Sequence, residues 1–157
     1  MKDSIQISND FKEFAELLEK NSVKYLIIGG FAVNFHGYPR YTKDIDIWLM
    51  VDHSNIENFL ITLKEFGFES LGLNEKDFTD KDNIIQLGYE PNRIDILVSV
   101  DGLEFQKTYE NRLDYKYDDI CLNFISIDDL IIAKQTSGRP QDLADADFLL
   151  KLKNRTK

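Results

Sequence analysis

The stretch Thr42-Lys43-Asp44-Ile45-Asp46-Ile47-Trp48-Leu49-Met50-Val51 decides the fold that the sequence predicts. From its fourth residue onward, every second residue is aliphatic, which is typical of a β-strand with one face on the core. Side chains two residues apart on a strand point the same way, so Asp44 and Asp46 are expected side by side. They share the opposite face of the strand with Trp48 and Met50, which does not resemble a fully solvated surface.

The paired carboxylates of Asp44 and Asp46 predict a bound cation. Two bare carboxylates this close repel each other, and their oxygens are ligands that suit a hard divalent ion. The alternative is a solvated strand face, which is common in an acidic protein.

A pair of glycines, Gly29-Gly30, follows a second predicted strand at residues 23–28 and precedes a predicted helix at residues 31–35. Glycines at such a turn let a phosphate reach backbone N–H groups near a helix N-terminus. The alternative is a strand-to-helix turn that only needs small residues.

A third carboxylate, Asp95, lies in another predicted strand at residues 93–98. Ile94 and Ile96 form the core face of this strand, which places Arg93 and Asp95 on the other face. If the strand lies beside the first one, Asp95 joins the two earlier carboxylates; otherwise it forms an isolated Arg–Asp pair on the surface. A glycine turn and three carboxylates together are the components of a phosphoryl-transfer site.

The remaining pattern predicts an α/β or α+β fold, with a mixed β-sheet flanked by helices. Two hairpins are expected, one from residues 84–87 and 93–98 and one from residues 113–117 and 120–124. Ser54 and Glu57 are expected to form a capping box. One predicted helix ends near Lys20 and another ends at Gly67. Three further helices are predicted at residues 103–111, 126–137 and 141–152.

Length and composition indicate one domain spanning residues 1–157. Lys plus Arg is 19 and Asp plus Glu is 28, so the net charge of −9 argues against a broad basic surface for nucleic acid and suits a cationic substrate or metal ions. The single cysteine, Cys121, fits a reducing compartment. Since no signal sequence or membrane span is visible, we expect a cytoplasmic protein without a membrane partner.

The ordered motifs resemble the nucleotidyltransferase superfamily, whose fold is shared with DNA polymerase β. Three stretches resemble its small bacterial branch that includes the AbiEii-type toxins. They are residues 37–46 (GYPRYTKDID), residues 91–97 (PNRIDIL) and the pattern Lys134-x4-Arg139-Pro140-x-Asp142-Leu143-x-Asp145. The resemblance covers about residues 23–150. One departure is Gly29-Gly30, because many superfamily members carry Gly-Ser there.

The resemblance implies that Asp44, Asp46 and Asp95 are catalytic and hold two Mg²⁺ ions, with Mn²⁺ as an alternative. Asp95 would also be the base for the acceptor hydroxyl. The reaction would move a nucleoside monophosphate from a nucleoside triphosphate, with pyrophosphate leaving. Gly29 and Gly30 would lie near the triphosphate.

The remaining expected nucleotide-binding residues are basic or polar. Arg40 and Lys43, with Thr42 between them, flank the carboxylate strand and can reach a triphosphate. Lys134 and Arg139 would hold the leaving pyrophosphate, and the alternative is that Lys134 only complements a helix dipole.

The acceptor and the partners stay open at this stage. The acceptor would be a tRNA 3′ end, as in AbiEii-type toxins, or a small molecule such as an antibiotic. A third reading is a non-catalytic nucleotide-binding member of a toxin–antitoxin pair, with a cognate antitoxin as its partner.

Overall fold

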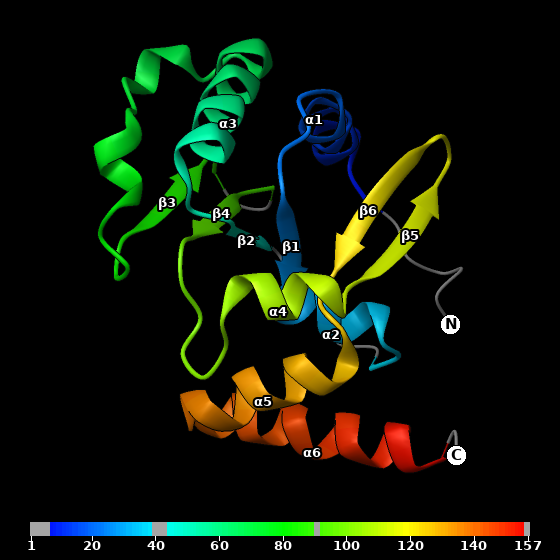
Figure 1. Ribbon diagram of the computed structural model, residues 1–157. Helices are drawn as coiled ribbons and strands as arrows, with labels where there is room; N and C mark the ends of the chain where they lie inside the picture. The colour runs from blue at the N-terminus through cyan, green and yellow to red at the C-terminus, as the bar shows by residue number, and fades with distance from the viewer. Residues whose placement is uncertain (1–6, 39–43, 90–91, 156–157) are drawn as a thin grey trace.

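The computed structural model describes residues 7–38, 44–89 and 92–155. Within these residues, six strands form one mixed sheet in the order β3-β4-β2-β1-β6-β5 (Figure 1). The strands β2 and β4 are parallel, as are β1 and β6, whereas β1–β2 and the two hairpins β3–β4 and β5–β6 are antiparallel. The strands are β1 Tyr25–Ile28, β2 Ile45–Leu49, β3 Ile84–Leu87, β4 Ile94–Leu97, β5 Leu113–Tyr117 and β6 Ile120–Phe124.

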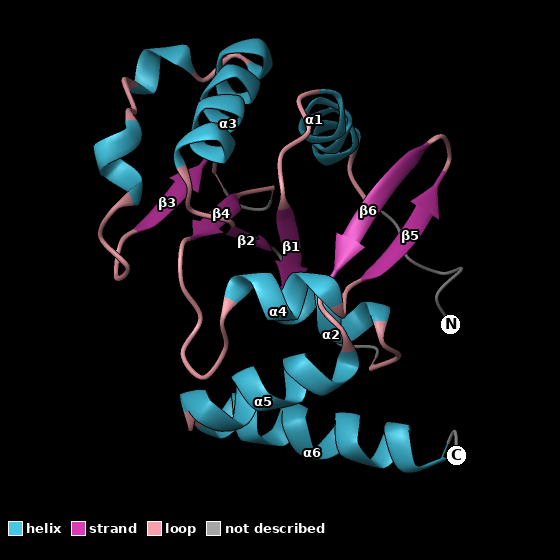
Figure 2. Cartoon of the chain, viewed as in Figure 1, coloured by secondary structure: helices cyan, strands magenta, loops and turns pink. Residues whose placement is uncertain are grey.

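Helices cover both faces of the sheet. In Figure 2, α1 and α3 lie on one side, and α2, α4, α5 and α6 lie on the other. Phe14 of α1 packs edge-on against Phe59 of α3, with ring centroids 6.2 Å apart. The helices are α1 Asn9–Lys20, α2 Gly29–Phe35, α3 His53–Phe66, α4 Phe105–Glu110, α5 Ile127–Ser137 and α6 Pro140–Arg155, with short 3₁₀ turns at η2 Glu69–Leu71 and η3 Glu75–Phe78. No helix in the described ranges has both the length and the apolar character needed to cross a bilayer.

The prediction that β2 has a single core face is wrong. Trp48, on the face assigned away from the core, is 2% exposed and packs edge-on against Phe105 of α4 at 5.1 Å. Val51, expected on the core face, lies beyond the end of the strand and is 44% exposed. The reason is that β2 is an interior strand with helices on both sides, so its two faces are both buried.

Several predicted helix boundaries are confirmed by their caps. The side chain of Ser8 accepts a hydrogen bond from the backbone N–H of Phe11, and Ser126 accepts one from Asp129, both at 3.1 Å. Gly138 ends α5 in the left-handed conformation, at φ 70°. Both predicted hairpins form.

The predicted capping box at the start of α3 is wrong. Asp52, not Ser54, is the N-cap, and its carboxylate accepts the backbone N–H of Asn55 at 2.7 Å. The helix therefore begins at His53, directly after the extended chain that leaves β2. A capping residue is defined by where the chain turns, and sequence spacing alone did not locate that turn.

A buried asparagine ties α3 to the two central strands. The side chain of Asn55 accepts the backbone N–H of Lys24 at 2.7 Å and donates to the carbonyls of Lys24 and Met50 at 3.0 and 2.7 Å. These residues adjoin the ends of β1 and β2. The contacts hold the paired ends together, opposite the end that carries the acidic residues.

Candidate active site

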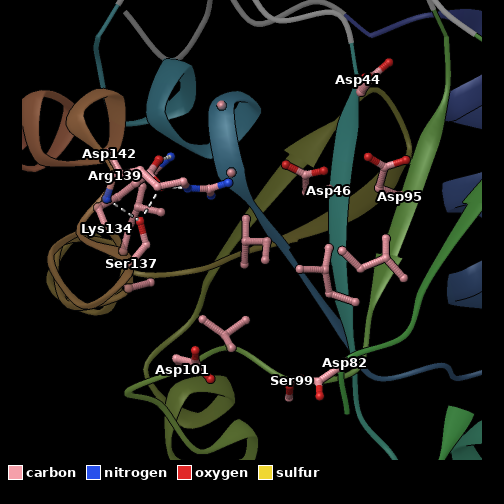
Figure 3. Close-up of a pocket in the computed structure, with 18 of the residues that line it drawn as sticks. Asp44, Asp46, Asp82, Asp95, Ser99, Asp101, Lys134, Ser137, Arg139 and Asp142 are labelled. Carbon is pink, nitrogen blue, oxygen red and sulfur yellow. Dashed lines mark hydrogen bonds and ion pairs between the residues drawn. The ribbon is translucent and has the colours of Figure 1, made fainter. Parts of the chain in front are cut away.

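Two of the three carboxylates are brought together by the parallel pairing of β2 and β4. Asp46 is the register partner of Asp95 across these strands. Paired residues on neighbouring strands project to the same face, so the two side chains are direct neighbours. Figure 3 shows Asp46 and Asp95 on adjacent strands, with Asp44 just before β2 begins. β4 therefore lies beside β2, which is the condition under which the sequence placed Asp95 with the other two carboxylates.

The carboxylate of Asp46 occupies the space that a side chain on residue 29 would fill. Ile28, the last residue of β1, is the register partner of Asp46, and the chain then turns at Gly29 with φ +70°. A Cβ atom on residue 29 would collide with the carboxylate oxygen of Asp46. Glycine is therefore favoured here for two independent reasons, the left-handed backbone and the close approach of the Asp46 side chain.

The surroundings of Asp46 disfavour its charge. Burial, followed by the nearby charge of Asp95, raises the pKa of Asp46 to about 6, and Asp44 adds to the effect. The positive charges of Lys134 and Arg93 act in the opposite direction. Asp95 and Asp44 therefore lie close enough to Asp46 to repel its negative charge.

Arg93 bridges two of these carboxylates. Its Nη2 lies 3.0 Å from Oδ2 of Asp44, and its Nε and Nη2 lie 2.8 and 3.2 Å from the two carboxylate oxygens of Asp95. All three side chains are mostly shielded, with 24%, 19% and 14% of Arg93, Asp44 and Asp95 exposed. Arg93 is thus tied to two carboxylates from different parts of the chain and does not form an isolated pair with Asp95 on the surface.

A second charged cluster joins α5 to α6. Nζ of Lys134 lies 3.0 Å from a carboxylate oxygen of Asp142 and 3.1 Å from one of Asp145, whose side chain is fully buried. Asp142 also accepts hydrogen bonds from the Ser137 hydroxyl and, at 2.9 Å, from Nε of Arg139. Burial alone would raise the pKa of Asp142, but the hydrogen bonds from Ser137 and Lys134 outweigh it and lower the pKa.

Both clusters line one open pocket of about 770 Å³. Figure 3 shows three parts of its wall: the acidic β2–β4 strands, the α5–α6 turn, and loops that carry acidic and hydroxyl groups. The loop residues are Asp82, Ser99 and Asp101. Of the predicted site residues, the pocket is lined by Gly29, Gly30, Asp44, Asp46, Asp95, Lys134 and Arg139. Arg40, Thr42 and Lys43 lie outside the described residues.

The three carboxylates supply oxygen atoms of the kind that a divalent cation takes as ligands, but these atoms do not converge on one point. Among the residues that the structure describes, no three His, Cys, Asp or Glu side chains form a group that could hold a metal ion. Carboxylate oxygens are nevertheless the ligands that Mg²⁺ prefers. The guanidinium of Arg93 between Asp44 and Asp95 also shows that this place accommodates a positive charge.

Residues 6–149 match the family DUF6036, which is described as a nucleotidyltransferase of unknown function. The chain belongs to this family. The DUF6036 protein is therefore a nucleotidyltransferase, and the enzyme class that the sequence motifs predict is confirmed. A search of curated proteins finds no match.

Solved structures support the same fold for this DUF6036 protein. An antigenic nucleotidyltransferase-like protein from Paracoccidioides brasiliensis is 16% identical, with a TM-score of 0.57 over 91% of this chain and 74% of that one. The lincosamide antibiotic adenylyltransferase LnuA, solved with lincomycin bound, is 18% identical, with a TM-score of 0.54 over 93% and 98%. A candidate nucleotidyltransferase from Thermotoga maritima is 15% identical, with a TM-score of 0.56 over 92% and 91%. The predicted nucleotidyltransferase fold is confirmed.

Several residues that line the DUF6036 pocket or contact its carboxylates were not singled out as site residues from the sequence. Arg93 contacts both Asp44 and Asp95. The sequence indicated only the contact with Asp95, because Arg93 lies two residues before it on the same strand face. Ser137 precedes the helix-ending Gly138 and gave no signal beyond that. Asp82 and Asp101 lie in loops without periodicity, and only the folded chain brings them to the pocket.

Proposed function

We propose that this DUF6036 protein transfers a nucleoside monophosphate from a nucleoside triphosphate to a hydroxyl acceptor, with pyrophosphate leaving, in a Mg²⁺-dependent reaction. The observation that carries the proposal is the register pairing of Asp46 with Asp95, beside Asp44, on one wall of a pocket that also contains Lys134 and Arg139. Carboxylates that hold divalent ions and cations that face a transferred phosphate are the recurring parts of phosphoryl-transfer sites.

The three carboxylates have distinct roles in this proposal. Asp44, Asp46 and Asp95 would hold two Mg²⁺ ions, or Mn²⁺ as an alternative. When bound, such ions neutralise phosphate charge and lower the pKa of a coordinated hydroxyl. Asp95 would accept the proton of the acceptor hydroxyl on a carboxylate oxygen. Asp46, seated on Gly29, would keep the ligand set in a fixed position relative to the turn.

The phosphate tail would extend from Gly29 and Gly30 toward the α5–α6 turn. Arg139 is suited to contact the pyrophosphate, because 78% of its side chain is exposed at the pocket wall. Lys134 would contribute mainly through its charge, since Asp142 and Asp145 hold its ammonium group in place. Arg40, Thr42 and Lys43 would complete the nucleotide site, as the resemblance to the superfamily implies.

The loops at the far part of the pocket favour a small acceptor, neutral or cationic. Asp82 and Asp101 line this part, and they would repel the phosphates of an RNA chain. The short stretches that resemble AbiEii-type toxins favour a tRNA 3′ end instead, together with a cognate antitoxin. A cytoplasmic location is part of either proposal, because nucleoside triphosphates are available there.

One incubation separates these outcomes. The protein is mixed with Mg²⁺ and each α-labelled nucleoside triphosphate, with total RNA or a panel of small hydroxyl compounds as acceptors. Label in a small product supports the small-molecule proposal, and label in RNA supports the tRNA proposal. Absence of label from every acceptor, together with nucleotide binding, would support the non-catalytic reading.

A further inference from the structure

We infer that Arg93 is a built-in counter-ion of the proposed active site, whose guanidinium competes with divalent metal for Asp44 and Asp95. The inference rests on the proposed function, because it assigns metal binding to those carboxylates. It concerns how this chain regulates metal binding, and it names a positioning residue that does not itself touch the substrate.

The backbone places Arg93 where it can reach both carboxylates. The carbonyl of Arg93 accepts the backbone N–H of Ile45 at 3.1 Å, which ties the start of β4 to the start of β2. Asp44 directly precedes Ile45, and Asp95 is two residues beyond Arg93 on the same strand face. The side chain therefore extends between two acidic groups that belong to different strands.

The contacts occupy the oxygens that a metal ion would use. Nε and Nη2 of Arg93 face both oxygens of Asp95, at 2.8 and 3.2 Å, and Nη2 also lies 3.0 Å from Oδ2 of Asp44. This two-pronged arrangement is the strong form of an arginine–carboxylate contact. A divalent ion that takes Asp95 as a ligand would compete with these N–H groups for the negative charge of the same two oxygens.

The competition cannot be relieved by deprotonation. A guanidinium stays charged at every pH at which the protein is folded. The guanidinium of Arg93 contacts the carboxylates of Asp44 and Asp95, and its charge and that of Lys134 of α5 both act on Asp46. The ammonium group of Lys134 is held by Asp142 and Asp145. Within the described residues, the cation that contacts Asp44 and Asp95 directly is Arg93.

The consequence is weak metal binding by the free protein. The free energy of metal binding is reduced by the free energy needed to break the contacts between Arg93 and the carboxylates. A triphosphate offers the metal ion additional anionic oxygens as ligands, so nucleotide binding would offset the competition from Arg93 and couple metal binding to substrate. A purely structural Arg93 predicts the reverse for a variant, because carboxylates that lose their orienting partner would bind metal less well.

The test uses Arg93→Met, which keeps the length of the side chain and removes its charge. Mn²⁺ is titrated into nucleotide-free protein and its binding is followed by electron paramagnetic resonance. We expect the variant to bind Mn²⁺ at least tenfold more tightly than the wild type, with Arg93→Lys in between. We also expect a lower Tm than the wild type without metal and a larger rise in Tm on addition of Mn²⁺.

The chain contains a matched control. Arg112 contacts Asp114 through Nε at 2.9 Å with the same spacing of two residues, and neither residue lines the pocket. Arg112→Met makes the same change in net charge and should leave Mn²⁺ affinity within twofold of the wild type. Adding Asp95→Asn to Arg93→Met should abolish the tight Mn²⁺ site.

The outcomes separate the inference from the proposed function. If Arg93→Met binds Mn²⁺ equally or more weakly while the wild type turns over nucleotide, the counter-ion inference is overturned and the proposed function stands. If neither protein binds Mn²⁺, with or without a triphosphate, and no turnover occurs, both are overturned. Circular dichroism on Arg93→Lys and Arg93→Met shows whether each variant is folded before it is scored.

Discussion

The carboxylate of Asp46 lies against Gly29, at a point where any side chain on residue 29 would collide with it. The contact joins the turn after β1 to the carboxylate pair on β2 and β4, so the position of one of the proposed metal ligands depends on the absence of a side chain.

Gly29→Ala tests this dependence. The left-handed backbone at φ +70° disfavours alanine by about 1–2 kcal/mol, and the collision adds to that cost. A displacement of Asp46 by about 1 Å would lower turnover by roughly a hundredfold. Both quantities are measured by thermal unfolding and by release of labelled pyrophosphate.

Gly72→Ala is the matched control for the cost of placing alanine in a left-handed backbone. Gly72 has φ +64°, and a Cβ atom there would meet nothing within 4 Å. Because of backbone strain, this variant should have a lower Tm than the wild type, and its turnover should equal that of the wild type. Equal turnover losses in the two variants would contradict the proposed contact between residue 29 and Asp46.

Asp46→Asn should stabilise the metal-free protein at neutral pH. The pKa of Asp46 is about 6 when folded, against a usual value of 3.8, so protonated Asp46 contributes stability that is present below pH 3.8 and is lost as the pH rises through 6. Asparagine does not ionise, so the variant does not lose this stability as the pH rises. The expected gain in the free energy of unfolding above pH 7 is about 1–2 kcal/mol, allowing for solvent screening.

The measurement is urea unfolding in EDTA between pH 4 and pH 8. The difference between Asp46→Asn and the wild type should grow from pH 4 to pH 6 and then level off. Asp119→Asn, in the β5–β6 turn, should show no such growth. A pH-independent difference would show that Asp46 is not held in a charge-disfavouring site.

Arg139→Ala and Lys134→Ala should have opposite profiles. Arg139 is 78% exposed, so its loss should leave Tm nearly intact and weaken nucleotide binding at least tenfold, about 1.4 kcal/mol. Lys134 is 11% exposed and pairs with the fully buried Asp145, so its loss removes the cation from a buried ion pair and should cost about 3–5 kcal/mol of stability.

Calorimetry of unfolding and of nucleotide binding separates the two effects. Lys151→Ala, which removes an exposed ion pair with Asp147 on α6, is the control and should change neither quantity measurably. A large fall in Tm for Arg139→Ala, or none for Lys134→Ala, would reverse the roles assigned to the two cations.

The pairing of Asp46 with Asp95 illustrates how far sequence reasoning reaches. Alternation along each strand placed both carboxylates away from the aliphatic face, and the ordered motifs resembled one superfamily. Their actual proximity depends on β2 and β4 being parallel neighbours in register. Only the resemblance, and not the periodicity, implied that arrangement.

The burial of Trp48 and the bridging by Arg93 mark where sequence reasoning failed. Helices packed on both faces of β2 bury Trp48, and an alternating pattern does not show what covers the second face. The contact of Arg93 with Asp44 crosses between strands that are far apart in the chain. Spacing rules describe neighbours within one element, whereas both of these features belong to the assembled sheet.

The most direct measurement is transfer of label from an α-labelled nucleoside triphosphate in the presence of Mg²⁺. Wild-type protein, Asp46→Asn and Asp119→Asn are compared with total RNA and with the small-molecule panel as acceptors. We expect wild type and Asp119→Asn to transfer label to an acceptor and Asp46→Asn, still folded, to transfer none. Transfer by Asp46→Asn at the wild-type rate would contradict the central claim that this carboxylate site performs the reaction.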